Sequence, residues 1–128
     1  MRALATILAP VVTIVAPLSG ELLPAVFGSM HGTFHGAIPP GHTLWVLVRD
    51  PMNYYLMYPP TQVVHATGQW TQTNIRLATP GDWELSLCIA NDTASAWLDA
   101  RAKKSDWSGF PSLPDGLEVV QSVKVRRS

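Results

Sequence analysis

Four histidines and one cysteine are the residues of this 128-residue chain best suited to hold a metal ion. His31 and His35 lie four positions apart in a run that alternates apolar and polar residues, which favours a strand. Two such side chains share a strand face, but their Cα atoms are about 13 Å apart at about 3.3 Å per residue. Zinc binds its ligands at about 2 Å. We therefore expect no metal site and no cofactor.

Catalytic chemistry finds little support in the sequence. Cys88 lies inside a strong strand pattern, where a cysteine is usually a small buried hydrophobic residue. The chain has no Gly-x-Ser-x-Gly elbow, no phosphate-binding glycine loop and no His-Glu-x-x-His motif. Asp50, Asp82 and Asp115 each adjoin a proline or a glycine, so turn formation explains them. An enzyme would need a pocket that gathers histidines and carboxylates, for instance His65 with Asp50, and we expect none.

Aromatic residues are the more informative group, because five of the 128 residues are tryptophan. Trp45 and Trp83 fit core positions, and Trp97 fits the buried face of a helix. Aromatic rings at a surface can stack on sugars or anchor a protein interface, whereas ordinary core packing is the alternative explanation. The candidates for an exposed interface are Tyr54, Tyr55, Tyr58, Trp70 and Trp107.

Composition excludes several classes of protein. Nine Lys and Arg balance nine Asp and Glu, 14% of residues are charged and 47% are hydrophobic, which is typical of a folded domain and not of a disordered chain. The basic clusters are short, so we expect no nucleic-acid partner. A single cysteine cannot form an internal disulfide, so the hydrophobic core must hold the fold together. Zero net charge makes self-association plausible.

The N-terminus has a superficial likeness to a signal peptide, because Arg2 precedes the mostly apolar run Ala3–Ala16. Pro10 and the residues that follow favour a different interpretation, in which Val11–Val15 is a β-branched strand that enters the core. The run is too short to span a bilayer, so we expect no membrane insertion. We expect a lead-in over residues 1–10 and one domain over 11–128. The compartment stays open, with an extracytoplasmic location favoured over a cytoplasmic one.

Eleven prolines and nine glycines separate short apolar runs along the whole chain, which is typical of a β-sandwich or barrel. The core of one run, Leu44–Val48, is apolar on both faces and predicts a strand covered on both sides. In another run Thr71, Thr73, Ile75 and Leu77 share one face, opposite Trp70 and Gln72. The expected strands are Val11–Val15, Ala25–His35, His42–Arg49, Tyr54–Tyr58, Gln62–Ala66, Trp70–Ala78, Trp83–Ile89 and Leu117–Val125.

One helix interrupts the strands. The alanine-rich stretch Ala94–Lys104 has Asp92 or Thr93 as its N-cap, and we expect it to cover one end of the sandwich. Its predicted apolar stripe consists of Trp97, Leu98 and Ala102. In the last strand, Leu117, Val119, Val123 and Val125 are in phase, and Val120 is out of phase, which suggests a β-bulge.

The order of these segments resembles bacterial immunoglobulin-like modules over nearly the whole chain, from Val11 to Arg126. The first half of the resemblance lies in Val12–Gly20, Gly32–Gly36, Gly41–Arg49 and Tyr58-Pro59. The second half lies in Gly68–Trp70, Leu85–Ala90, Leu113–Gly116 and Val123–Arg126, and is similar to a subgroup with a helix before the last strand. The paired cysteines of antibody-type domains, with a tyrosine two residues before the second, are missing. The resemblance implies an immunoglobulin-like antiparallel β-sandwich with one short helix.

Such modules serve as accessory, spacer or ligand-binding units and share no catalytic residues. We therefore expect a non-catalytic protein-interaction or assembly module that binds through a sandwich face or through an edge strand such as Leu117–Val125. A low content of charge before Arg49 predicts that Val11–Ile38 either faces the core or leaves an apolar patch suited to a partner. An evenly polar outer face of Val11–Ile38 would remove the main support for an interface there. The alternative is a carbohydrate-binding module that uses at least two exposed, coplanar Tyr or Trp rings.

Overall fold

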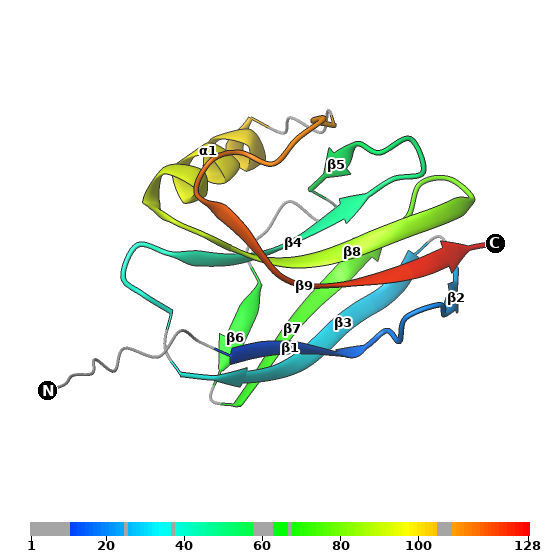
Figure 1. Ribbon diagram of the computed structural model, residues 1–128, viewed down its shortest axis with the longest axis horizontal. Helices are drawn as coiled ribbons and strands as arrows, with labels where there is room; N and C mark the ends of the chain where they lie inside the picture. The colour runs from blue at the N-terminus through cyan, green and yellow to red at the C-terminus, as the bar shows by residue number, and fades with distance from the viewer. Residues whose placement is uncertain (1–10, 25, 37, 58–62, 67, 105–108) are drawn as a thin grey trace, which may run out of the picture.

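The computed structural model describes residues 11–24, 26–36, 38–57, 63–66, 68–104 and 109–128. The elements are β1 (Val11–Ala16), β2 (Leu22–Leu23), β3 (Val26–His35), β4 (Thr43–Arg49), β5 (Tyr55–Leu56), β6 (Val64–Ala66), β7 (Gly68–Arg76), β8 (Gly81–Ala90), α1 (Asp92–Lys103) and β9 (Leu117–Arg127). One sheet has the order β1-β3-β7-β6 and the other β2-β9-β8-β4-β5. The two sheets face each other (Figure 1), so the expected mainly β sandwich with one short helix is confirmed.

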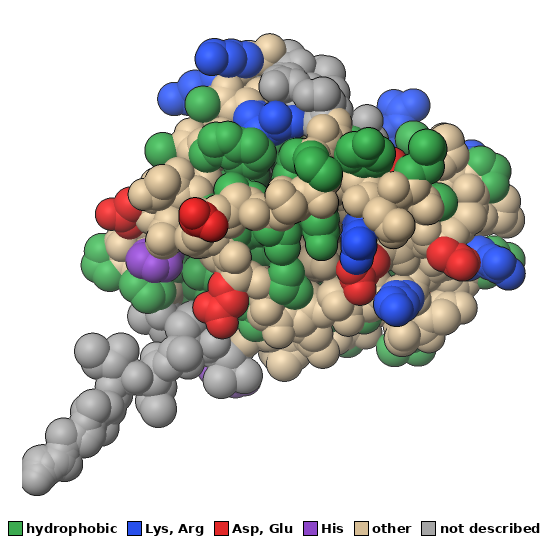
Figure 2. All heavy atoms as spheres, turned by 45° about the horizontal axis from the view of Figure 1, so that its top comes forward, with side chains coloured by type: hydrophobic (Ala, Val, Ile, Leu, Met, Phe, Trp, Pro, Cys, Tyr) green, Lys and Arg blue, Asp and Glu red, His purple; other side chains and the backbone are tan. Residues whose placement is uncertain are grey.

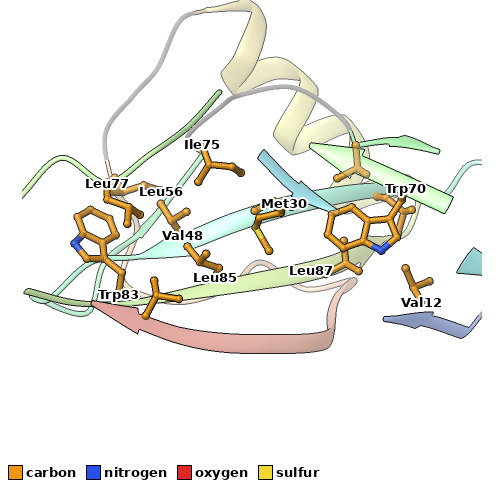
Figure 3. Close-up of a cluster of buried hydrophobic side chains, with 14 of the residues drawn as sticks. Val12, Met30, Val48, Leu56, Trp70, Ile75, Leu77, Trp83, Leu85 and Leu87 are labelled. Carbon is orange, nitrogen blue, oxygen red and sulfur yellow. The ribbon is translucent and has the colours of Figure 1, made fainter. Parts of the chain in front are cut away.

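The main core fills the space between the two sheets. Along β8 the inward positions are Trp83, Leu85 and Leu87, as the alternating pattern predicts, and all three are buried. Trp83 and Trp70 lie at opposite ends of this core, with Met30 between them (Figure 3). Both indole N–H groups are satisfied, because Trp70 donates to the Thr13 carbonyl at 2.7 Å and Trp83 donates to the Thr79 carbonyl at 2.8 Å.

Strand β7 changes its buried face part-way along. Thr73 lies opposite Ser29, but Ile75 lies opposite Gly28, so Asn74 is an extra residue in the ladder and forms a bulge. The bulge reverses the alternation, so Thr71 and Thr73 are exposed and the expected grouping of these two residues with Ile75 and Leu77 is wrong. The buried side chains of this segment are Trp70, Gln72, Ile75 and Leu77.

The last strand carries the bulge that its sequence suggests. Gln121 pairs with Leu87 and Val119 pairs with Cys88, which leaves Val120 as the extra residue. Val120 packs against the main core, while Val119 is 39% exposed. The expectation that Leu117 and Val119 are in phase with Val123 and Val125 is therefore wrong, because the bulge places the first two side chains on the outer face of the sheet.

The helix packs on the outer face of the five-stranded sheet rather than across an end of the sandwich (Figure 1). Trp45 and Cys88 point outward from β4 and β8, and α1 covers them with Ala94 and Leu98. Strand β4 is thus buried on both faces, as its continuous apolar run predicts. The expected position at one end is wrong because these outward apolar side chains need a cover.

Asn91 begins the helix. Its side-chain oxygen accepts a hydrogen bond from the Ala94 backbone N–H at 3.0 Å, so the N-cap lies one residue before the expected Asp92 or Thr93. A group of hydroxyls ties the first turn to the sheet. Ser95 and Thr43 join their hydroxyls at 2.7 Å, Ser95 also donates to the Ala90 carbonyl at 3.1 Å, and the Trp45 indole N–H donates to Thr43 at 2.7 Å.

Candidate functional site

An aromatic surface joins α1, strand β5 and the segment that leads to β9. It consists of Tyr54, Tyr55, Trp97, Arg101 and Phe110. Tyr55 and Phe110 form an isolated antiparallel bridge, in which each backbone N–H donates to the other residue's carbonyl, at 2.9 and 3.0 Å. This bridge occupies the outer edge of β5 and holds Phe110 beside the helix.

The rings of the aromatic surface are packed in a row. The Tyr55 and Phe110 ring centroids are 6.1 Å apart with an interplanar angle of 23°, and Trp97 meets Phe110 edge to face at 5.1 Å. The Arg101 guanidinium carbon lies 4.9 Å from the Trp97 centroid and 5.0 Å from the Phe110 centroid. At the other end, the guanidinium of Arg49 lies 5.3 Å from the Tyr55 centroid. These contacts fix the side chains before any partner arrives.

Two rings of the aromatic surface face solvent. Tyr54 is 44% exposed and Trp97 is 37% exposed, whereas Phe110 is buried between its neighbours. A Cβ at Gly109 would lie only 3.0 Å from the Tyr54 Cβ, so Tyr54 packs directly on the backbone that leads to Phe110. The surface can therefore offer two exposed aromatic side chains and one guanidinium to a partner, and the contacts to Phe110 and Arg101 hold the Trp97 ring.

The structure brings together only some of the aromatic residues that the sequence offers as candidates for an exposed interface. Tyr54 is exposed and Tyr55 is half-buried. The expected exposure of Trp70 is wrong, because this side chain is 1% exposed and the bulge in β7 keeps it in the core. Tyr58 and Trp107 lie outside the described residues.

Trp97 and Phe110 are the members that sequence reasoning missed. The helix buries Ala94, Ser95 and Leu98, so its apolar stripe is centred on positions 94 and 98, and Trp97 lies beside it. The expectation that Trp97 belongs to the buried stripe is wrong for this reason. The spacing from Trp97 to Arg101 is i to i+4, which places the guanidinium over the indole and could have indicated the pair.

The described N-terminal strands do not offer an apolar face over Val11–Ile38, which is one of the two expected alternatives. Four of the outward side chains described on β1 and β3 are polar: the hydroxyl groups of Thr13 and Thr33 hydrogen-bond to each other, and His31 and His35 are exposed. The exposed large apolar side chains of this region are Val15 near the end of β1, Leu18 where the chain crosses between the sheets, and Leu22 in β2. Of the two expected alternatives, the described strands β1 and β3 therefore follow the first, because Val12, Met30 and Phe34 face the core and most of the described outer face is polar.

Strand β9 is only partly an edge. Strand β2 pairs with it at Arg126 and Arg127, and the Gln121 side chain accepts the backbone N–H of Ile14 at 2.6 Å. A partner strand is expected to pair along Leu117–Val125. Strand β2 pairs with β9 just beyond this stretch, and the Gln121 side chain already contacts β1 in the middle of it.

In the described part of the chain, the histidines and the cysteine do not cluster with one another or with carboxylates into a group of three. Among these residues there is no group of three metal-ligating side chains. His65 stacks on Phe34 at 5.0 Å in the four-stranded sheet, while Asp50 follows β4 of the other sheet and accepts the Met52 and Tyr54 backbone N–H groups at 2.9 Å. Burial raises the pKa of the Cys88 thiol to about 12, which disfavours the nucleophilic thiolate.

A hollow of about 550 Å³ lies at the end of the five-stranded sheet that α1 leaves uncovered. Its lining comes from the turn after β4, the start of β8, the end of β9 and Gly20. Acids and bases both contribute to it, in contrast to the aromatic surface. The lining residues are Gly20, Arg49, Asp50, Asn53, Asp82, Trp83, Glu84, Lys124, Val125 and Arg126.

Searches against protein-family models and against curated proteins found no match to this chain. No helix within the described residues is long and apolar enough to cross a membrane.

Proposed function

We propose that this chain is a non-catalytic protein-interaction module with a bacterial immunoglobulin-like fold, and that it binds its partner through the aromatic surface. The observation that carries the proposal is that Trp97 and Tyr54 are exposed, while Phe110 and Arg101 pack against the Trp97 ring and the Tyr54 Cβ packs close to Gly109. Trp, Tyr and Arg are the residues most enriched in the energetic centres of interfaces. Side chains fixed in advance lose little entropy on binding.

The strand order supports the immunoglobulin-like part of the proposal. Immunoglobulin sandwiches have strands A, B, E and D in one sheet and C, F and G in the other. If β1, β3, β4, β6, β7, β8 and β9 are taken as A to G in chain order, the two sheets become A-B-E-D and G-F-C. Helix α1 then lies between F and G, as in the subgroup with a helix before the last strand.

The test compares partner capture by three forms of the protein. One form is unchanged, one is Tyr54→Ala/Trp97→Ala, and the matched control is Leu18→Ala/Leu22→Ala, which removes two exposed apolar side chains from the chain between β1 and β2 and from β2 itself. A protein captured from the source lysate is identified, purified and titrated against each form. We expect the aromatic double variant to bind at least about tenfold more weakly, since one energetic centre contributes about 2 kcal/mol or more.

Two results would contradict the proposal. Equal loss of affinity in the control would mean that binding follows general surface apolarity. Full affinity in the aromatic double variant, with its circular dichroism unchanged, would move the interface to another part of the molecule.

Carbohydrate binding has less support. It needs two exposed coplanar rings, whereas among the described nominees Tyr54 is exposed, Tyr55 is half-buried against Phe110, and Trp70 is buried. Gel electrophoresis through immobilised polysaccharides separates the two functions. Retardation of the unchanged protein that Tyr54→Ala abolishes, without any protein partner, would favour the carbohydrate-binding function instead.

A further inference from the structure

We infer that the open end of the five-stranded sheet is a self-complementary surface through which two copies of this chain associate. The surface consists of two charged columns. The acidic column is Asp82 and Glu84 on β8, and the basic column is Lys124 and Arg126 on β9. None of these residues belongs to the aromatic surface, so this inference stands independently of the proposed function.

The register of the strands sets the columns side by side. Asp82 pairs with Arg126 and Glu84 pairs with Lys124 across the antiparallel ladder, so each acid has a base at the same height. Residues directly opposite each other share a face of the sheet. The helix covers the other end of this face, where Ala90 and Cys88 lie, and leaves the charged end open. Figure 2 shows acidic and basic side chains interleaved at that end.

The charges on this surface are incompletely neutralised within one copy. Arg126 Nε lies 3.1 Å from Asp82 Oδ1, but these two side chains remain 68% and 80% exposed. Arg49 approaches Glu84 only to 3.9 Å. Among the described residues, the Lys124 ammonium has no ion-pair partner within 4.0 Å. Each column therefore keeps charge and donors or acceptors available to a second molecule.

A two-fold axis makes the columns complementary to themselves. If the axis runs parallel to the strands, between β8 and β9, it places the acidic column of one copy against the basic column of the other. Asp82 then faces Arg126 of the second copy, Glu84 faces Lys124, and each contact occurs twice, as in any isologous interface. All four residues of the two columns also line the hollow described above, so a second copy that meets the columns meets the hollow as well.

The charge balance of the whole chain favours the same occupant. Nine basic residues against nine acidic residues leave no net charge, so two copies meet without long-range repulsion. A partner of one dominant charge would be attracted by one column and repelled by the adjacent one. A second copy is matched by both, which is why we take it as the occupant.

The test uses charge reversal followed by mixing. Asp82→Lys/Glu84→Lys gives two basic columns, and Lys124→Glu/Arg126→Glu gives two acidic columns. Analytical ultracentrifugation over a dilution series measures association of each. We expect the unchanged protein to dimerise, each variant alone to dimerise at least about tenfold more weakly, and the equimolar mixture to recover dimers, because opposite columns attract across an interface. Raising NaCl from about 0.05 M to about 0.5 M should weaken the native dimer through screening.

Two further variants keep the test decisive. Lys103→Glu/Lys104→Glu reverses two exposed bases at the end of α1 and should leave the dimer unchanged. Glu84→Gln with Lys124→Gln removes charge without reversing it, in case a reversal variant fails to fold, and should weaken the dimer. A protein that is monomeric at low salt would overturn the inference. So would folded reversal variants whose mixture stays monomeric, since that result assigns the charges to pairs within one copy.

Discussion

The outer face of the five-stranded sheet has two ends of opposite chemistry, although β4, β8 and β9 run through both. At the end near α1, Trp45 and Cys88 point outward and are buried under the helix. At the other end, Arg49, Glu84 and Lys124 point outward, and the described residues place no element over them. The change takes place within a few residues of the same strands.

This difference shows that the residue types at the outward positions of a strand indicate whether a second layer covers them. Along β8 these positions are Asp82, Glu84, Ser86, Cys88 and Ala90, which go from charged through small polar to apolar. The residues of β9 that pair with them also go from charged to small polar to apolar, from Arg126 to Leu117. A gradient of this kind predicts both that a second layer is present and where it ends, because uncompensated burial of a charge is costly and continuous exposure of apolar area is unfavourable.

The largest effect should come from removing the helix's main contact at the covered end. Leu98 is fully buried against the outer face of the sheet, so Leu98→Ala should lower the free energy of unfolding by about 3 kcal/mol through lost burial and the cavity left behind. Urea denaturation measures the change. Leu18→Ala, at an exposed position, is the control and should stay within about 0.5 kcal/mol. Equal losses in both variants would mean that the helix is not anchored through Leu98.

The next effect should come from the hydroxyl that joins the helix to the sheet. Ser95→Ala removes the contact to Thr43 and the bond to the Ala90 carbonyl, and leaves buried polar atoms with fewer partners. We expect a loss of about 2 kcal/mol, since an unsatisfied buried group costs about 1–3 kcal/mol. Ser95→Thr, which keeps the hydroxyl, should recover part of the loss. A neutral Ser95→Ala would show that the helix is held by its apolar contacts alone.

The buried thiol at the covered end should make stability depend on alkaline pH. Burial raises the pKa of Cys88 from 9.0 to about 12, so above pH 9 the unfolded chain loses the thiol proton while the folded chain keeps it. Stability therefore falls as pH rises, and this group should contribute a loss of about 1.4 kcal/mol by pH 10. The measurement is urea unfolding at pH 8 and pH 10 for the native protein and for Cys88→Ala. The same fall in both proteins would contradict the assignment to Cys88.

The smallest effect should come from the open end. Asp82→Asn breaks the exposed pair with Arg126 and should change the free energy of unfolding by about 0.5 kcal/mol or less, since an exposed ion pair contributes little. The comparison is made by denaturation at low protein concentration, with and without added salt. A loss as large as that of Leu98→Ala would mean that the two ends of the face contribute to the fold alike.

Much of the fold is readable from the sequence because the strands obey simple alternation. Trp83, Leu85 and Leu87 form the inward row of β8, and the continuous apolar run of β4 correctly predicts cover on both faces. The errors arise at bulges. The extra residue Asn74 reverses the buried face of β7, and a single residue without a partner leaves no periodic signal of its own.

The candidate site was less predictable, because it joins residues far apart in the chain. The exposure of Tyr54 can be predicted from its position beside a turn. The other aromatic residues of the site, Phe110 and Trp97, come from a connecting segment and a helix. No local sequence pattern predicts the backbone bridge between Phe110 and Tyr55. Trp70 shows the converse problem, since a tryptophan in an alternating strand can lie on either face until the register is known.

The crossing of the chain from one sheet to the other has a mechanical consequence. After β1 the chain enters β2, which runs parallel to β9 and pairs Leu22 with Arg126 and Leu23 with Arg127. The Gly20 and Arg126 backbone N–H groups add bonds to the Lys124 and Glu21 carbonyls at 2.6 and 2.9 Å. Tension that pulls the chain before β2 away from the chain after β9 acts along these strands. Their bonds are then loaded in shear and must give way together, rather than opening one by one.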